Sequence, residues 1–311
     1  MSNFDFSTKL ADAWFPTPLF TASGCASSGK ELSQFFDLRS IGAVVTKSIM
    51  IKPRAGRPTP RMAETPSGML NSIGLQGPGI DAFLGDDIPW LLNQGARIIV
   101  SIAGETVDEF STLARRLRGV TGISAVEVNI SCPNVENRGL VFACDPDSAS
   151  AVINGVKMMI GGELPIIAKL SPDVTNIAQI AASVFNAGAD AVALINTLLG
   201  MVINLETMKP QLGGRTGGLS GPAIRPIAVR AIYQVREALP KLPILGMGGV
   251  ASGRDALELI LAGASGVSVG TANFGNPSAV YEIQEELRKL LIDRGFRSLT
   301  DAVGYAHREG S

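Results

Sequence analysis

The chain has 311 residues, of which 46% are hydrophobic and 18% charged, and its formal net charge at pH 7 is −1. This composition supports a large buried core and excludes a disordered chain. A nearly neutral chain has no general attraction for nucleic acid or for an anionic membrane. The three cysteines (Cys25, Cys132 and Cys144) have no C-x-x-C spacing, which argues against a zinc or iron–sulfur site, and their odd number argues against a disulfide framework.

The N-terminal residues lack the basic and apolar stretches of a signal peptide, and no apolar run reaches the length of a membrane span. We therefore expect a cytoplasmic protein without a membrane partner.

Eight short, strongly apolar segments recur along the chain and are separated by helical patterns. The apolar segments are residues 18–23, 42–48, 97–104, 125–131, 165–171, 190–197, 243–249 and 265–271. The helical patterns cover residues 29–38, 106–119, 148–162, 176–189, 223–239, 253–264 and 278–295. Nearly continuous apolar runs are typical of parallel strands covered on both faces.

Eight such units in order predict a (β/α)8 barrel, with residues 1–311 forming a single domain. The alternative is a doubly wound sheet, which requires a glycine-rich dinucleotide fingerprint after the first strand; residues 21–29 match it poorly. Two connections are too long for a minimal barrel, residues 49–94 after the second strand and 197–222 after the sixth. Long insertions on this face usually form a substrate pocket or a lid.

Polar side chains stand where several predicted strands end. They are Lys47, Ser48, Asn129, Cys132, Lys169, Asn196 and Thr197, and the first insertion adds Asn71. Each asparagine alone could simply satisfy loop backbone. Together, two lysines, several amides and a thiol on one face predict a pocket for a planar, hydrogen-bonding and anionic molecule.

Glycines dominate the ends of the seventh and eighth strands, in residues 246–255 and 269–275. Glycine lets backbone N–H groups approach an anion closely, and this position in a barrel commonly binds phosphate. The pattern predicts a phosphorylated cofactor or substrate. Lys47 and Lys169 would then lie near the negative charge that develops on a reduced flavin ring.

A thiol is the leading candidate for a catalytic base. The only histidine, His307, lies four residues from the C-terminus, whereas Cys132 follows a strand that ends in polar residues. The alternative for any cysteine is a buried, inert thiol, and we assign that role to Cys25 and Cys144.

Several of these segments resemble the class 1 dihydroorotate dehydrogenases. The resemblance rests on residues 71–79, 126–135, 169–174, 195–201, 215–226 and 246–274, and it covers nearly the whole chain in order. Because Cys132-Pro133-Asn134 is followed by residues 135–139 of sequence VENRG, the chain is most similar to class 1B, the NAD-linked catalytic subunit.

The resemblance implies oxidation of dihydroorotate to orotate in pyrimidine biosynthesis, with one FMN per chain. Cys132 would remove the proton from C5 while hydride leaves C6 for the flavin. The substrate would be held by Lys47, Asn71, Ser72, Ile73, Gly74, Leu75, Asn129, Asn134, Asn196 and Thr197. FMN would be held by Ser23, Lys47, Ser48, Ser101, Asn129, Lys169, Ile195, Gly221, Gly248, Gly249, Gly270 and Thr271.

One departure concerns the end of the third strand, where the family commonly has an asparagine that touches the flavin and this chain has Ser101. A shorter hydroxyl with one donor puts that contact in doubt.

The resemblance also implies partners. We expect a homodimer and a separate electron-transfer subunit with FAD and a 2Fe–2S cluster, together a heterotetramer that passes electrons to NAD⁺. The alternatives are a homodimer that reduces fumarate, an enzyme similar to dihydropyrimidine dehydrogenase, a flavin-binding scaffold without activity, and a flavin-free lyase or isomerase with a Schiff base at Lys169.

Overall fold

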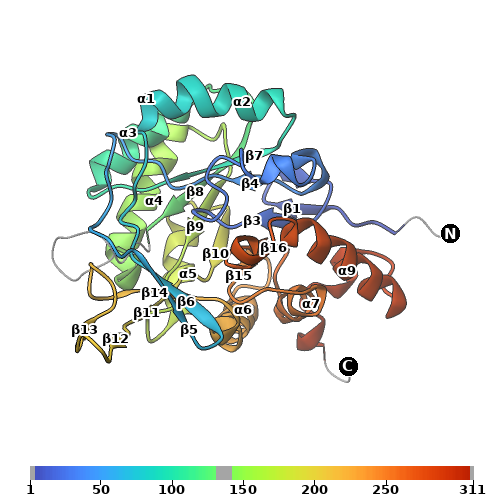
Figure 1. Cartoon of the computed structure of the whole chain (residues 1–311). Helices are drawn as coiled ribbons and strands as arrows, with labels where there is room; N and C mark the ends of the chain where they lie inside the picture. The colour runs from blue at the N-terminus through green and yellow to red at the C-terminus, as the bar shows by residue number, and fades with distance from the viewer. Residues whose placement is uncertain (1–3, 131–141, 309–311) are drawn as a thin grey trace.

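The computed structural model describes residues 4–130 and 142–308, and its centre is a closed parallel barrel (Figure 1). The strand order is β3-β16-β15-β10-β9-β8-β7-β4. The bounds are β3 (Leu19–Thr21), β4 (Val44–Val45), β7 (Ile98–Ile102), β8 (Ile123–Asn129), β9 (Ile166–Lys169), β10 (Ala191–Leu194), β15 (Ile244–Met247) and β16 (Gly266–Val269).

Hydrogen bonds close the barrel between its first two strands. The Gly42 N–H donates to the Leu19 carbonyl at 2.7 Å, and the Thr21 N–H donates to the Ala43 carbonyl at 3.3 Å. A sheet closed in this way has no free edge, so the predicted (β/α)8 barrel is confirmed.

Helices surround the barrel (Figure 1). The longer ones are α3 (Val107–Leu117), α4 (Pro146–Ile160), α5 (Ile177–Asn186), α6 (Arg225–Ala238), α7 (Gly253–Ala262) and α9 (Ala279–Asp293), with α8 (Ala272–Gly275) and α10 (Leu299–Ala302) as single turns. Four of the longer helices begin at a residue whose side chain accepts a hydrogen bond from the first turn: Thr106, Asp145, Asn176 and Ser252. These caps explain why the predicted helices start where they do.

Two local predictions were wrong. Residues 29–38 form no α-helix but the 3-10 turns η1 (Leu32–Gln34) and η2 (Leu38–Ser40). Asp37 adopts an extended backbone and accepts from the Arg39 N–H, which starts a new turn and interrupts the helical pattern. A helical run was also missed in the first insertion: α1 (Ile80–Ala82), the π-helical segment η3 (Phe83–Asp87) and α2 (Ile88–Asn93). Its glycine and proline obscured the helical pattern.

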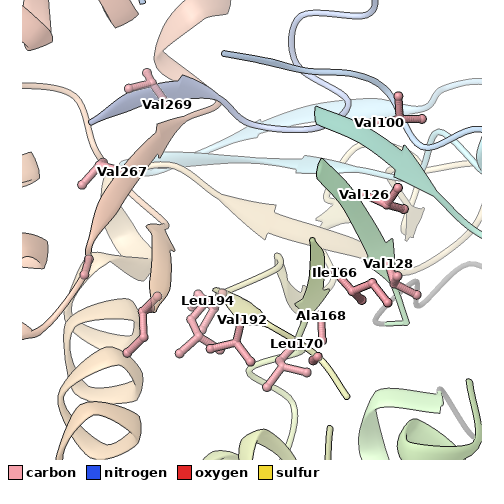
Figure 2. Packing of buried hydrophobic residues seen from close by; sticks show 14 of the residues in the cluster. Val100, Val126, Val128, Ile166, Ala168, Leu170, Val192, Leu194, Val267 and Val269 are labelled. Carbon is pink, nitrogen blue, oxygen red and sulfur yellow. The ribbon is translucent and has the colours of Figure 1, made fainter. Parts of the chain in front are cut away.

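The core has two layers because side chains alternate across each strand. The outer layer packs between strands and helices and includes Val126, Val128 and Ile166 (Figure 2). The inner layer fills the barrel and includes Phe20 and Ile167.

A hairpin closes the N-terminal end of the barrel. It consists of β1 (Thr8–Leu10) and β2 (Ala13–Phe15), and it buries Leu10 and Phe15 among the inner residues. The Thr8 hydroxyl donates to the carbonyl of Ser265, which immediately precedes β16. Apolar side chains fill that end of the barrel. The opposite end, where the strands have their carboxyl ends, is therefore the place for a binding site.

The two insertions join in one antiparallel sheet of order β11-β14-β6-β5. From the first come β5 (Met62–Thr65) and β6 (Gly68–Asn71), and from the second β11 (Leu198–Gly200) and β14 (Gly217–Ser220), while β12 (Ile203–Asn204) and β13 (Lys209–Pro210) form a separate hairpin. Figure 1 shows these strands beside the barrel. The predicted insertions after the second and sixth barrel strands are therefore confirmed. Among the described residues, no helix is long and apolar enough to cross a membrane.

Candidate active site

A cavity of about 440 Å³ lies where the carboxyl ends of the barrel strands meet the sheet formed by the insertions. Its wall brings together most of the residues that the sequence singled out. These are Ser23, Lys47, Ser48, Asn71, Ile73, Gly74, Leu75, Asn129, Lys169, Ile195, Asn196, Thr197, Gly221, Gly248, Gly249, Gly270 and Thr271.

Two of the described candidate residues, Ser101 and Ser72, lie outside the cavity wall. Ser101 lies one layer deeper, fully buried, with its Oγ 2.9 Å from the Oγ of Ser48. Ser72 is also buried, and its Oγ has no hydrogen-bond partner among residues 4–130 and 142–308. Cys132 and Asn134 lie outside the described residues, so their roles stay predictions.

Linked amides form one wall of the cavity. The Thr197 N–H donates to Asn196 Oδ1 at 2.8 Å, Asn196 Nδ2 donates to Asn129 Oδ1 at 3.4 Å, and Asn129 Nδ2 donates to Ser48 Oγ at 3.0 Å. On the insertion side, Asn71 Nδ2 donates to the Gly218 carbonyl at 3.3 Å. Neighbouring amides fixed in this way suit a planar ligand with several donors and acceptors.

Two lysines supply positive charge to the same cavity. Lys169 is buried and its Nζ donates to Ser23 Oγ at 2.9 Å. Burial lowers the pKa of Lys47 from its ordinary value, and the nearby Arg61 adds to the effect while Cys25 opposes it. Burial also raises the pKa of the Cys25 thiol, although Lys169 and Lys47 act in the opposite direction. A protonated lysine in so enclosed a place favours an anionic ligand.

A glycine cradle faces this wall at the ends of β15 and β16. At Gly249, with φ +72°, an added Cβ would lie 2.7 Å from the Arg225 Cβ and 2.9 Å from the Gly221 carbonyl. No larger residue fits there without a shift of the backbone, and the exposed backbone remains accessible to a ligand. Beside it, the buried Ser268 Oγ lines the cavity and has no hydrogen-bond partner in the part of the chain that the structure describes. A glycine turn and an unpaired hydroxyl fit a phosphorylated cofactor such as FMN.

Sequence reasoning missed several residues at or beneath the cavity. They are Cys25, Met62, Met69, Met247, Ser220, Ser268, Phe274 and, one layer deeper, Glu127. Glu127 had a visible signal, because it is the only charge in the apolar run 123–129. The methionines and Phe274 had none, because isolated apolar residues are as common in cores as in pockets.

The barrel and this site define a class of protein: a (β/α)8 barrel in which amides and lysines line a cavity at the carboxyl ends of the strands. Comparison with known proteins narrows that class. The family model for dihydroorotate dehydrogenase matches residues 6–291. The chain belongs to the dihydroorotate dehydrogenase family, a family of oxidoreductases that generally depend on FMN.

Several proteins of similar sequence carry the name "Dihydroorotate dehydrogenase B (NAD(+)), catalytic subunit". The protein of that name from Desulforudis audaxviator is 50% identical over 304 residues, which cover 98% of either chain. The protein from Desulforamulus reducens is 48% identical over 97% of this chain and 99% of its own. The protein from Geobacter sulfurreducens is 46% identical over 98% of this chain and 99% of its own. The predicted resemblance to class 1B is confirmed.

Proposed function

We propose that this chain oxidises (S)-dihydroorotate to orotate in pyrimidine biosynthesis, with FMN as its cofactor and a single barrel domain that works in the cytoplasm. The observation that carries the proposal is the cavity itself, in which linked amides and two lysines face a glycine cradle. The names of the relatives support the substrate.

The amide wall is assigned to the substrate. Lys47 would pair with the carboxylate, while Asn71, Asn129, Asn196 and Thr197 would hold the ring with the backbone of residues 72–75. Asn134 is assigned to the same wall from the sequence alone. Fixed donors and acceptors orient the ring before reaction, which removes part of the entropic barrier.

The opposite side is assigned to FMN. Its phosphate would lie at Gly248, Gly249, Gly270 and Thr271, and its ring and ribityl chain along Ser23, Lys47, Ser48, Asn129, Lys169, Ile195 and Gly221. Bound FMN supplies the hydride acceptor that no protein side chain offers. The chain's own contribution is orientation, positive charge at the cavity floor, and a base, assigned to Cys132.

Electron transfer to NAD⁺ is assigned to a partner subunit. The relatives' name joins "NAD(+)" to "catalytic subunit". The chain's three cysteines offer no ligand set for a cluster of its own. We infer a homodimer of this chain with two copies of a subunit that carries FAD and a 2Fe–2S cluster. A homodimer that reduces fumarate is the alternative.

The test is anaerobic mixing of the purified, FMN-loaded chain with dihydroorotate while flavin absorbance is followed. We expect rapid bleaching, followed by return of colour with NAD⁺ only when the partner subunit is present. Return of colour with fumarate alone would identify the alternative acceptor. Yellow protein that does not bleach would contradict the substrate assignment, and protein that takes up no FMN would contradict the cofactor.

The role of Cys132 is tested by substitution. Cys132→Ala should retain FMN and bleach about 100-fold or more slowly, because a positioned base contributes at least that factor. Cys132→Ser should retain some activity at high pH, since a hydroxyl is a poorer base than a thiolate. Bleaching of the alanine variant at the unmodified rate would show that the base is another group.

A further inference from the structure

Glu127 is an unusual residue for the inside of a barrel. It stands in the middle of β8, is fully buried, and lies opposite Ile167, an apolar residue of the inner layer, on the neighbouring strand β9. Its Oε1 accepts a hydrogen bond from Ser101 Oγ at 2.8 Å and lies 3.7 Å from the Nζ of Lys169. Its Oε2 has no hydrogen-bond partner among the described residues.

Such a carboxylate is costly for the fold. A buried ion pair commonly contributes less to stability than apolar side chains of the same size, because both charges lose their hydration. The unpaired Oε2 adds to that cost. Packing therefore does not explain an acid at this position, whereas the polar contacts of Glu127 do.

One group that Glu127 contacts is the cationic floor of the cavity. Lys169 lies between Glu127 and the cavity: its ammonium group pairs with the carboxylate on one side and donates to Ser23, a wall residue, on the other. The side chains of the pair are only 5% and 0% exposed, so water screens their charges little. The positive charge that the cavity receives from Lys169 is thus reduced by the carboxylate beneath it.

The other contact leads to the amide wall. An ionised carboxylate can only accept, so the Ser101 hydroxyl must donate to Glu127. The Ser48 hydroxyl must then donate to Ser101, and Asn129 must present its NH₂ group to Ser48. In this chain of hydrogen bonds the Asn129 Nδ2 faces Ser48, and its Oδ1 accepts from Asn196.

We propose that Glu127 is a positioning residue for both sides of the site. Through Ser101 and Ser48 it fixes the donor direction of the amide wall, and through Lys169 it sets the positive charge beneath the cofactor. The inference deepens the proposed function and rests on it, because it assumes FMN at the cavity floor and a planar carboxylate ligand at the wall.

Three variants separate the two roles. Glu127→Gln removes the charge and allows the side chain to donate as well as accept, so it affects both. Ser101→Ala cuts the hydrogen-bond chain and leaves both charges. Asp190→Asn is the matched control, because Asp190 pairs with Lys157 at 3.1 Å and immediately precedes β10, at the opposite end of the barrel.

Two ligands of the FMN-loaded proteins provide the readouts, and all variants are measured at one fixed pH. Sulfite binds oxidised flavin and leaves negative charge on the ring, so its Kd reports the charge at the floor. Orotate reports the amide wall. Glu127→Gln should tighten sulfite binding about tenfold, because the Lys169 charge is no longer balanced. It should weaken orotate binding about fivefold, the worth of one oriented hydrogen bond.

Ser101→Ala should weaken orotate to a similar degree and change the Kd for sulfite by less than about threefold, and Asp190→Asn should change neither. Unchanged or weaker sulfite binding by Glu127→Gln would overturn the charge role. Unchanged orotate binding by both Glu127→Gln and Ser101→Ala would overturn the orienting role.

If Glu127→Gln does not fold or hold FMN, the double variant with Lys169→Gln is compared with Lys169→Gln alone. Losing both charges is tolerated better than losing one. The double variant should bind sulfite more tightly than the single one, and equal affinities would overturn the charge role.

Bleaching of the unmodified chain by dihydroorotate distinguishes the two proposals: if the chain bleaches but the variants show no shift, only the role of Glu127 fails. A chain without FMN overturns both.

Discussion

At the scale of single residues, the site depends on positions where only one residue type is suitable. Gly249 combines a positive φ with backbone and side-chain atoms within 3 Å of an added Cβ. Lys47 is a cation in surroundings that disfavour its charge. Both features follow from the close approach of backbone and side chains at the barrel mouth, and each leads to a measurable consequence.

Gly249→Ala should lose stability and FMN together. Adopting a left-handed conformation with a side chain costs about 1 to 3 kcal/mol, and the clash with Arg225 would also distort the cradle. Thermal unfolding and the FMN content of purified protein measure the two effects. Gly85→Ala is the control, because beyond its own helix and chain neighbours nothing lies within 4 Å of an added Cβ there. Full FMN content in the Gly249 variant would contradict the cradle assignment.

Binding of orotate should weaken with rising pH before an ordinary lysine would lose its charge. Burial lowers the pKa of Lys47 below 10.5, so its ammonium form, which attracts the carboxylate, is fully present only below that lowered pKa. Lys47→Met should bind weakly at every pH. Titration gives the orotate Kd of the unmodified chain and of Lys47→Met at each pH. In the ratio of these two constants, any effect of the ligand's own ionisation cancels. Cys25→Ala should still bind orotate more weakly as the pH rises. If its orotate binding does not change with pH, the Cys25 thiol and not Lys47 causes the effect.

At the scale of elements, the second insertion is attached to the barrel by a carboxylate. Asp173, just beyond β9, accepts from the Leu199 N–H at 3.2 Å with both oxygens, and Leu199 is the middle residue of β11. This contact holds the segment that continues from Asn196 and Thr197. The insertion thus supplies wall residues in a place decided by a barrel loop.

Asp173→Ala should weaken orotate binding about fivefold and cost about 1 kcal/mol of unfolding free energy, with FMN retained, because the acceptor of the Leu199 N–H is lost. Ligand titration and denaturant unfolding measure this. Asn204→Ala is matched to it: Asn204 accepts from two backbone N–H groups in the exposed β12–β13 hairpin of the same insertion. Equal loss of orotate affinity in both variants would show that general loosening of the insertion is responsible.

At the scale of the whole molecule, the two ends of the barrel have separate tasks. The β1–β2 hairpin fills the N-terminal end with Leu10 and Phe15, and the ring of Phe15 packs edge-on against Phe20 with centroids 5.0 Å apart. The opposite end holds the cavity. Substitutions at the plugged end are therefore expected to change stability without changing ligand binding.

Phe15→Ala should reduce the free energy of unfolding by about 3 to 5 kcal/mol, the usual cost of a cavity left by a buried ring. Its folded fraction should bind orotate as before. Trp14→Ala, at a 52% exposed position of the same hairpin, should cost much less. Denaturant unfolding and orotate titration test both. Loss of orotate affinity in folded Phe15→Ala protein would show that the two ends are coupled.

Much of the site was predictable from the sequence, because a parallel barrel brings its strand ends together by construction. Once eight apolar runs are recognised, Lys47, Asn129, Lys169 and Asn196 must share one face. The glycines after the last two strands follow by the same rule. The prediction of a helix over residues 29–38 was wrong for a local reason, because the Asp37 side chain accepts a hydrogen bond from the backbone N–H of Arg39.

By itself the sequence determined the number and order of the strands, the two insertions and the polar residues at the strand ends. These depend on local periodicity, on glycine and on the regular geometry of the barrel. Only the tertiary structure decided that the two insertions pair into one sheet and that Ser101 turns away from the cavity to donate to Glu127. Both depend on contacts between residues far apart in the chain, which exist only after the barrel has closed and which no local pattern encodes.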